Sequence, residues 1–167
     1  MAADFKALSR NDQGALVAGV LALLFSFFGA YVVASVDGGD DLPISVDTSS
    51  GVNAWNSWAT LGMLLILVAV AVVAIKAFAA QSLPDTVPWR LVALAAAGLG
   101  TLLVILRALT ADGGGSFGSV SVSVGPGWSG WLLFIAAIAL TVFTALAFKD
   151  SGEKLPEVNK KNDPPAV

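Results

Sequence analysis

The chain has 167 residues, of which 56% are hydrophobic and 13% are charged, and its formal net charge is −3. Soluble domains are about 45–50% apolar and about 25% charged, so this composition indicates a membrane protein. Because the sequence contains no cysteine and no histidine, it excludes disulfides, thiolate chemistry, imidazole ligands for haem or zinc, and the commonest general acid–base residue.

Four apolar stretches predict four transmembrane helices. They lie at about residues 14–34, 58–80, 87–109 and 128–148. Each is close to the ~20 residues that cross a ~30 Å hydrocarbon core as a helix, whereas isolated strands would leave backbone groups unpaired in lipid. The expected fold class is therefore an all-α membrane protein, with a four-transmembrane-helix bundle over residues 1–148.

The first stretch also has features of a secretory signal peptide. Lys6 and Arg10 precede it, and Val32–Ser35 resembles a cleavage site. However, its apolar run is longer than the about 7–15 residues of a signal core, and cleavage would leave only three helices. We therefore expect the first stretch to remain as a helix.

Basic residues predict the orientation in the cell membrane. If both termini are cytoplasmic, Arg107 is the only basic residue on the outer side of the membrane. The positive-inside rule favours this orientation. The loops over residues 35–53 and 110–127 then face outward. The polar tail over residues 149–167 cannot bury enough apolar surface to fold alone, and is expected to be disordered in the cytoplasm. The basic residues on the cytoplasmic side are Lys6, Arg10, Lys76, Arg90, Lys149, Lys154, Lys160 and Lys161.

The two outward loops resemble each other in sequence. Each contains Asp-Gly-Gly, at residues 37–39 and 112–114, then an alternating Val/Ser-type stretch, and ends in Trp-x-x-Trp. Both hairpins enter from the cytoplasm, so the pattern predicts a parallel repeat of two helical hairpins about a pseudo-two-fold axis along the membrane normal. A chance likeness of two Gly- and Ser-rich loops is the alternative.

The outward loops also carry strand patterns. Asp-Gly-Gly is expected to end the outgoing helix of each hairpin, because these residues suit turns. Residues 119–124 alternate Ser and Val with a period of two, which is typical of a half-buried strand, and residues 42–47 alternate less regularly. We expect the two strands to pair in a small extracytoplasmic β element; two flexible loops are the alternative.

In each hairpin, one pair of tryptophans lies near the start of the second helix. Trp55 and Trp58 are three residues apart, as are Trp128 and Trp131, so each pair is expected to share a helix face at the outer membrane interface. Indole side chains collect at the headgroup level, so we interpret all four as interfacial anchors or partner contacts. An aromatic cage for a ligand is the alternative.

Charged residues near the helix ends are the remaining candidates for a site. Lys76 and Arg90 are expected to reach the cytoplasmic surface with their long side chains. Arg107 is expected to pair with Asp112, or with an acidic residue of the first loop, as a structural clamp; an anion or lipid-headgroup site is the alternative. The acidic residues of that loop, whose spacing does not match an EF-hand, are Asp37, Asp40, Asp41 and Asp47.

Three segments carry a family resemblance: Leu8–Tyr31, Asn53–Trp58 and Leu102–Leu109. They resemble a class of uncharacterised small actinobacterial four-helix integral membrane proteins. Those proteins begin with a short polar lead, an apolar helix with aromatic residues near its outer end, and an Ala-Trp at the start of helix two. The resemblance implies the same topology and no catalytic residue. Many of them have Pro-Trp-Tyr where residues 28–31 read Phe-Gly-Ala-Tyr here.

The sequence contains no recognisable catalytic motif. No Asp or Glu lies in the middle of a predicted helix, and there is no Walker loop, dinucleotide fingerprint or nucleophile–base set. We therefore expect no enzyme activity, catalytic residue, cofactor, metal or nucleic-acid partner. The expected function is that of a structural or accessory subunit, in contact with the lipid bilayer and with a membrane-protein partner or a second copy. A small oligomeric transporter or channel is the alternative.

Overall fold

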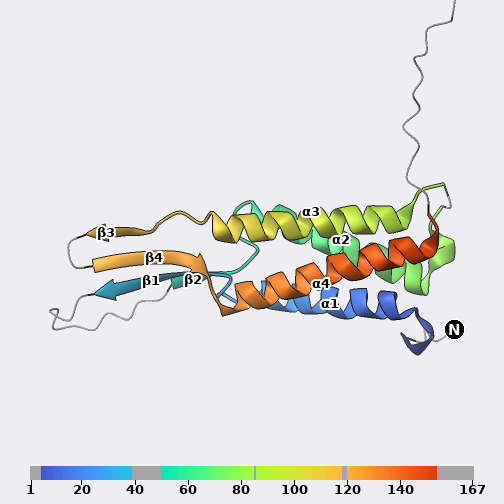
Figure 1. Cartoon of the computed structure of the whole chain (residues 1–167), viewed down its shortest axis with the longest axis horizontal. Coiled ribbons are helices and arrows are strands. Elements are labelled where there is room, and N and C mark those ends of the chain that lie inside the picture. The colour runs from blue at the N-terminus through green and yellow to red at the C-terminus, as the bar shows by residue number, and fades with distance from the viewer. Residues whose placement is uncertain (1–4, 39–49, 85, 118–119, 154–167) are drawn as a thin grey trace, which may run out of the picture.

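The computed structural model describes residues 5–38, 50–84, 86–117 and 120–153. In it, four α-helices lie side by side as an elongated bundle, and the strands extend from one end of that bundle (Figure 1). The described elements, in chain order, are η1 (Phe5–Ala7), α1 (Arg10–Ser26), β1 (Val32–Gly38), β2 (Ser50–Val52), α2 (Ala59–Phe78), η2 (Ala80–Ser82), α3 (Trp89–Leu109), β3 (Gly115–Phe117), β4 (Val120–Pro126) and α4 (Trp128–Ser151).

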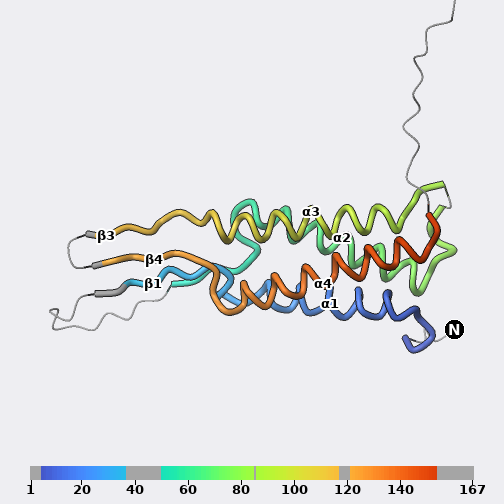
Figure 2. The backbone as a smooth tube through the Cα atoms, in the orientation of Figure 1, coloured from blue at the N-terminus to red at the C-terminus, as the bar shows by residue number. Residues whose placement is uncertain are grey.

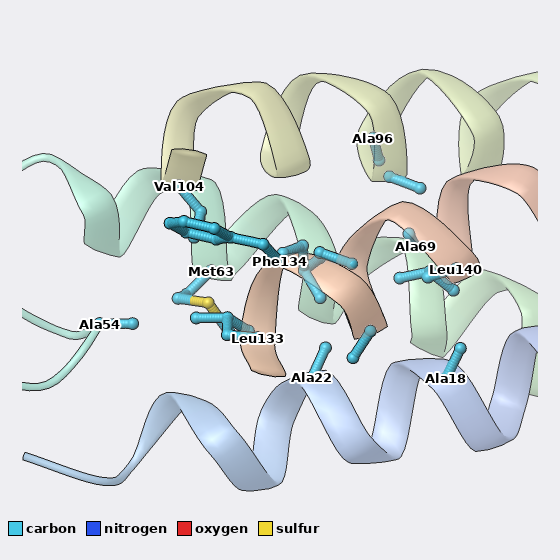
Figure 3. Close-up of a cluster of buried hydrophobic side chains, with 14 of the residues drawn as sticks. Ala18, Ala22, Ala54, Met63, Ala69, Ala96, Val104, Leu133, Phe134 and Leu140 are labelled. Carbon is cyan, nitrogen blue, oxygen red and sulfur yellow. The ribbon is translucent and has the colours of Figure 1, made fainter. Parts of the chain in front are cut away.

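The bundle is built from two closely packed helix pairs. Helix α1 packs along α4 and α2 packs along α3, while less extensive contacts join α3 to α4 and α1 to α2. Small residues permit this close approach: a Cβ added to Gly100 of α3 would lie only 2.7 Å from the carbonyl oxygen of Gly62 in α2. The interior is filled by small and medium apolar side chains, including Ala22, Leu133 and Leu140 (Figure 3).

Three of the helices, α2, α3 and α4, are long and apolar enough to span a membrane. Helix α1 does not meet the same requirement of length and hydropathy, because it has only 17 residues and its first turn carries Arg10 and Asp12. At 1.5 Å per residue it extends for about 25 Å, slightly less than a ~30 Å hydrocarbon core. Length and composition thus support three spanning helices within the predicted four-helix bundle.

The bounds of the last three helices agree with the sequence prediction to within three residues. The largest difference is at the end of α4, where residues 149–151 belong to the helix and not to the predicted tail. Gly152, with a left-handed φ of 67°, ends this helix in the conformation that favours glycine. The rest of the predicted tail, residues 154–167, lies outside the described residues.

The predicted first helix over residues 14–34 is wrong at both ends. Helix α1 already begins at Arg10, because the Ser9 hydroxyl caps it by accepting a hydrogen bond from the Asp12 N–H at 3.1 Å. It ends at Ser26, and residues 32–34 lie in strand β1. Hydropathy does not separate a short apolar strand from the end of an apolar helix, which explains the error.

A small antiparallel sheet joins the two hairpins, in the order β2-β1-β4-β3. Figure 2 shows β1, β4 and β3 side by side at one end of the bundle. Its central strands β1 and β4 pair over seven residues, from Val32 opposite Pro126 to Gly38 opposite Val120. Strand β4 confirms the predicted strand at residues 119–124 except for Ser119, which is not described. The other predicted strand, residues 42–47, lies outside the described residues, and β1 pairs with β4 instead.

The pairing of the helices is compatible with the predicted pseudo-two-fold axis, whereas the pairing of the strands is not. Such an axis would exchange α1 with α3 and α2 with α4, so the α1–α4 and α3–α2 pairs are equivalent under it. The same axis would relate β1 to β3 and β2 to β4, so the observed β1–β4 pair would require an equivalent β3–β2 pair, but β2 and β3 lie at opposite edges of the sheet. Likewise, residues 37–38 lie inside β1, so the first Asp-Gly-Gly does not end helix α1 as predicted, whereas residues 112–114 precede β3.

Candidate functional site

The charged residues of the described helices lie in their first or last turns, at the two ends of the bundle. One end, called the basic end here, carries Arg10, Lys76, Arg90 and Lys149 on the four helices. The opposite end, called the sheet end, carries the four strands together with Arg107 in the last turn of α3. The sequence predicted this separation of the basic residues.

A buried ion pair lies at the basic end. The Arg90 guanidinium donates two parallel hydrogen bonds to the Asp12 carboxylate, from Nη1 to Oδ1 and from Nη2 to Oδ2, the latter at 3.0 Å. The Ser9 hydroxyl donates a third hydrogen bond to Asp12 Oδ2 at 2.8 Å. Asp12 is only 5% exposed. The pair therefore joins α1 to α3, which are not among the closely packed helix pairs.

The environment of Asp12 keeps its carboxylate charged. Burial by itself raises the pKa of Asp12, but the hydrogen bonds from Arg90 and Ser9 and the charge of Arg90 outweigh burial, so the pKa lies below its ordinary value of 3.8. Asp12 precedes the apolar stretch that begins at Gly14. A carboxyl group with a lowered pKa is a structural anion and is poorly matched to proton transfer near neutral pH.

A second set of contacts extends the basic end to the other helices. Glu153 accepts a hydrogen bond from the Arg90 backbone N–H through Oε2 at 3.0 Å, and its Oε1 lies 3.6 Å from Lys76 Nζ. Asn11 donates a hydrogen bond to Asp150 at 2.6 Å. Sequence reasoning missed these partners and expected Lys76 and Arg90 simply to reach the surface. No local pattern indicates the partners, because they lie more than 60 residues away.

At the sheet end, Tyr31 connects three parts of the chain. Its hydroxyl donates a hydrogen bond to the backbone carbonyl of Val104 in α3, 2.5 Å away. Its backbone N–H donates to Val52 at 3.1 Å, and its carbonyl accepts from the Gly127 N–H at 3.1 Å. Tyr31 is almost fully buried. This residue therefore fixes the turn after α1 against α3, β2 and the start of α4.

The predicted helix face shared by Trp55 and Trp58 is wrong. Both residues precede α2, which begins at Ala59, and the chain turns between them at Ser57, whose φ is 57°. The Trp55 indole N–H donates to the Ser26 hydroxyl at 2.9 Å, and its ring stacks on Phe27 with centroids 5.6 Å apart. These contacts with the end of α1 hold Trp55 outside the helix.

The second pair, Trp128 and Trp131, lies in the first turn of α4 as predicted. Both indoles are more than half exposed, at 55% and 56%. Trp128 contacts Phe28, with ring centroids 5.1 Å apart. Exposed or half-buried aromatic residues near the starts of α2 and α4 and the end of α1 thus lie at the end of the bundle where the sheet begins, an arrangement typical of a membrane–water interface. This aromatic band consists of Phe27, Phe28, Trp55, Trp58, Trp128 and Trp131.

The structure does not bring Arg107 and Asp112 together. Arg107 is partly exposed in the last turn of α3, Asp112 is exposed, and within the described residues neither forms an ion pair. Helix α3 ends at Leu109, where the Thr110 hydroxyl donates to the Leu106 carbonyl at 2.7 Å. Pairing of Arg107 with the first loop stays a prediction, since the side chains of its acidic residues lie outside the described part.

A hollow of about 460 Å³ lies on the face of the sheet next to Trp128, but few polar groups line it. Among the described residues, its lining adds to the Trp128 indole only the hydroxyls of Ser35 and Ser123, and no described base lies within hydrogen-bond distance of either. Within residues 5–38, 50–84, 86–117 and 120–153, no three acidic residues cluster as metal ligands would. No protein-family model, curated protein or solved structure matches the chain, so the functional conclusion rests on this geometry.

Proposed function

We propose that all four helices cross the cell membrane, so that the protein is multi-pass with both termini in the cytoplasm and the sheet outside. The apolar lengths of α2, α3 and α4 support this proposal. For α1, the support is its exposed apolar face: Val17 and Val20 are 51% and 58% exposed, and Leu21 and Leu24 are also exposed. Such a face is costly in water but is suited to hydrocarbon.

The short length of α1 is compatible with a crossing. The turn that follows it places Phe27 and Phe28 at the surface, in the aromatic band, so apolar side chains continue beyond the last helical residue. A helix slightly shorter than the hydrocarbon layer is accommodated by local thinning or by flanking side chains, at a modest cost per Å. The basic end then faces the cytoplasm, in agreement with the positive-inside rule.

Within the membrane, the protein acts as a structural or accessory subunit and not as an enzyme. The observation that carries this proposal is the internal pairing of polar groups within the bundle: the Thr101 hydroxyl lies 3.0 Å from both the Ala137 carbonyl and the Thr141 hydroxyl. Among the buried side-chain polar atoms of the described residues, only Ser129 Oγ, in the first turn of α4, has no hydrogen-bond partner. A solute pathway needs unpaired polar or ionisable groups facing a cavity. The described buried charge, Asp12, is instead neutralised by Arg90.

The sheet offers the surface through which such a subunit contacts a partner. Its outer strands, β2 and β3, are three residues each and form its two edges. Edge strands present unpaired backbone N–H and C=O groups, and an extended segment of another chain adds to such an edge by main-chain hydrogen bonds. We therefore expect a partner protein, or a second copy, to bind at an edge outside the membrane.

The test is affinity purification of the full-length protein in a mild detergent, followed by mass spectrometry. We expect a membrane-protein partner or a second copy to be recovered, and Ser50→Lys or Ser116→Lys, which place a charge at the sheet edges, to reduce its recovery severalfold. The matched control is Ser121→Lys, an exposed position on the central strand β4. Purification of a monomer that transports a solute in proteoliposomes would contradict the accessory role.

A further inference from the structure

A groove between α1 and α4 runs along the surface of the bundle and encloses about 570 Å³. Along α1 it extends from Arg10 to Phe25, which corresponds to about 22 Å at 1.5 Å per residue. Helices α1 and α4 are close neighbours, and Figure 1 shows them side by side over this length. The groove therefore extends through much of the depth of a ~30 Å hydrocarbon core in the proposed orientation.

The bottom and the walls of this groove are apolar. Small residues lie along both helices, with Ala18 on α1 and Ala136 and Ala139 on α4. Larger side chains stand at its margins, where Val17 is 51% and Ile135 is 65% exposed. In the proposed orientation these margins face lipid, so the groove is open to a flexible hydrocarbon chain from the side. The volume of the groove is within the range of ordinary ligand sites.

Polar groups line the groove only at the basic end, in the first turn of α1. Gln13 donates hydrogen bonds to the backbone carbonyls of Phe5 and Leu8 at 3.1 and 3.0 Å, which holds the segment before α1 against the end of the groove. The other polar group is the guanidinium of Arg10. Arg10 is exposed and forms no ion pair within the described part of the chain, where Asp12 is already occupied by Arg90.

We propose that this groove binds one anionic glycerophospholipid, with an acyl chain between α1 and α4 and the phosphate at Arg10. Charge complementarity argues for this occupant: an apolar groove whose described lining has one cation, unpaired within the described residues, at the cytoplasmic end matches an amphipathic anion of the inner leaflet. The planar guanidinium also suits bidentate binding of phosphate. The inference rests on the proposed membrane crossing of α1.

The experiment uses the full-length protein and measures lipid binding by native mass spectrometry. Carbonate extraction of membranes first establishes whether the protein is integral, and labelling of Ala7→Cys and Ser50→Cys in intact cells with an impermeant thiol reagent establishes whether α1 crosses. The purified protein is then titrated with phosphatidylglycerol or phosphatidylcholine of identical acyl chains, and with glycerol 3-phosphate. We expect one phosphatidylglycerol to bind with about fivefold preference, as one basic side chain near an anionic headgroup provides, and glycerol 3-phosphate not to compete.

Two matched pairs of variants locate the binding site. Arg10→Gln should abolish the preference for phosphatidylglycerol, whereas Lys149→Gln, an exposed cation at the same end of the bundle, should retain it. Val17→Trp should fill the groove and reduce binding of both lipids. Val20→Trp, an equally exposed position on α1 that does not line the groove, should leave binding unchanged.

The possible failures are distinguishable. If the protein is washed from membranes by carbonate, or if Ala7→Cys and Ser50→Cys are both labelled in intact cells, the proposed membrane crossing of α1 fails together with this inference. If the protein is integral but binds both lipids equally, or if Arg10→Gln retains the preference, only the lipid site is overturned. Competition by glycerol 3-phosphate would indicate a simple phosphate site. A dimer or a second protein displaced by Val17→Trp would show that the groove is a protein interface.

Discussion

The carboxylate of Asp12 accepts both arms of the Arg90 guanidinium and so joins the first turn of α1 to the first turn of α3. At the opposite end of the bundle, the Tyr31 hydroxyl reaches the Val104 carbonyl and joins the segment after α1 to α3 again. These two polar contacts lie across the bundle between helices that are not closely packed neighbours. They therefore fix one hairpin against the other at both ends.

We predict that Asp12→Asn destabilises the protein strongly. The change leaves the Arg90 guanidinium partly buried without its anionic partner, and breaking a buried ion pair in this way costs about 3 kcal/mol. Thermal unfolding in detergent measures the effect. The control is Asp150→Asn, an exposed carboxylate with a single hydrogen bond to Asn11, which should change stability by less than about 0.5 kcal/mol. Equal effects of the two changes would contradict the assigned role of Asp12.

The same pair predicts a pH dependence in the acid range. Because the pKa of Asp12 is lowered by folding, its contribution to stability is present above the ordinary value of 3.8 and is lost as the pH falls below it. The unfolding temperature of the wild type should therefore fall as the pH decreases from 5 to 3. The unfolding temperature of the Asp12→Asn variant should lack the part of this decrease that is due to protonation of Asp12. Parallel pH profiles for the two proteins would refute the assignment.

Two glycines of α3 provide a matched test of helix packing. A Cβ at Gly100 would lie 2.7 Å from the Gly62 carbonyl oxygen, whereas a Cβ at Gly98 would meet only Thr141 at an ordinary 3.9 Å. Gly100→Ala should therefore cost about 1–3 kcal/mol through overpacking against the α2 backbone. Gly98→Ala should be neutral or stabilise by up to about 1 kcal/mol, because alanine is the better helix former. Denaturation of both variants checks the contrast, and a neutral Gly100→Ala would contradict the close approach.

The pairing of β1 with β4 is testable by disulfide formation, since the chain has no cysteine of its own. Ser35 and Ser123 lie directly opposite each other, at the separation of cross-strand neighbours. The double variant Ser35→Cys/Ser123→Cys should form an intramolecular disulfide in oxidised membranes, visible as a gel-mobility shift. Ser35→Cys/Ser116→Cys should not, because β4 separates β1 from β3. The opposite result would favour the pairing that a two-fold axis requires.

The sequence predicts a helix most accurately where the apolar run and the helix cover the same residues. The apolar runs of α2, α3 and α4 begin and end within three residues of the helices themselves. After α1 the apolar run continues through Val32–Ala34, which pairs with β4 in the sheet. Hydropathy does not distinguish these two backbone conformations, and the paired strand, which lies 90 to 94 residues further along the chain, decides between them.

The contacts at the two ends were only partly predictable. The spacing of Ser9 and Asp12 is a recognisable helix-capping pattern, but the partner of Asp12 lies 78 residues away and depends on how the helices are arranged. Similarly, Trp128 and Trp131 were placed correctly because their helix begins at Trp128. Trp55 was not, since its position follows from its contacts with the end of α1.

The most direct test of the account is the topology of single-cysteine variants in intact cells, probed with a membrane-impermeant thiol reagent. Ser50→Cys in the sheet should be labelled, whereas Ala7→Cys before α1 and Ser82→Cys after α2 should be labelled only after the cells are broken. Labelling of both Ala7→Cys and Ser50→Cys in intact cells would show that α1 does not cross the membrane. Labelling of Ser82→Cys alone would show that the sheet lies in the cytoplasm.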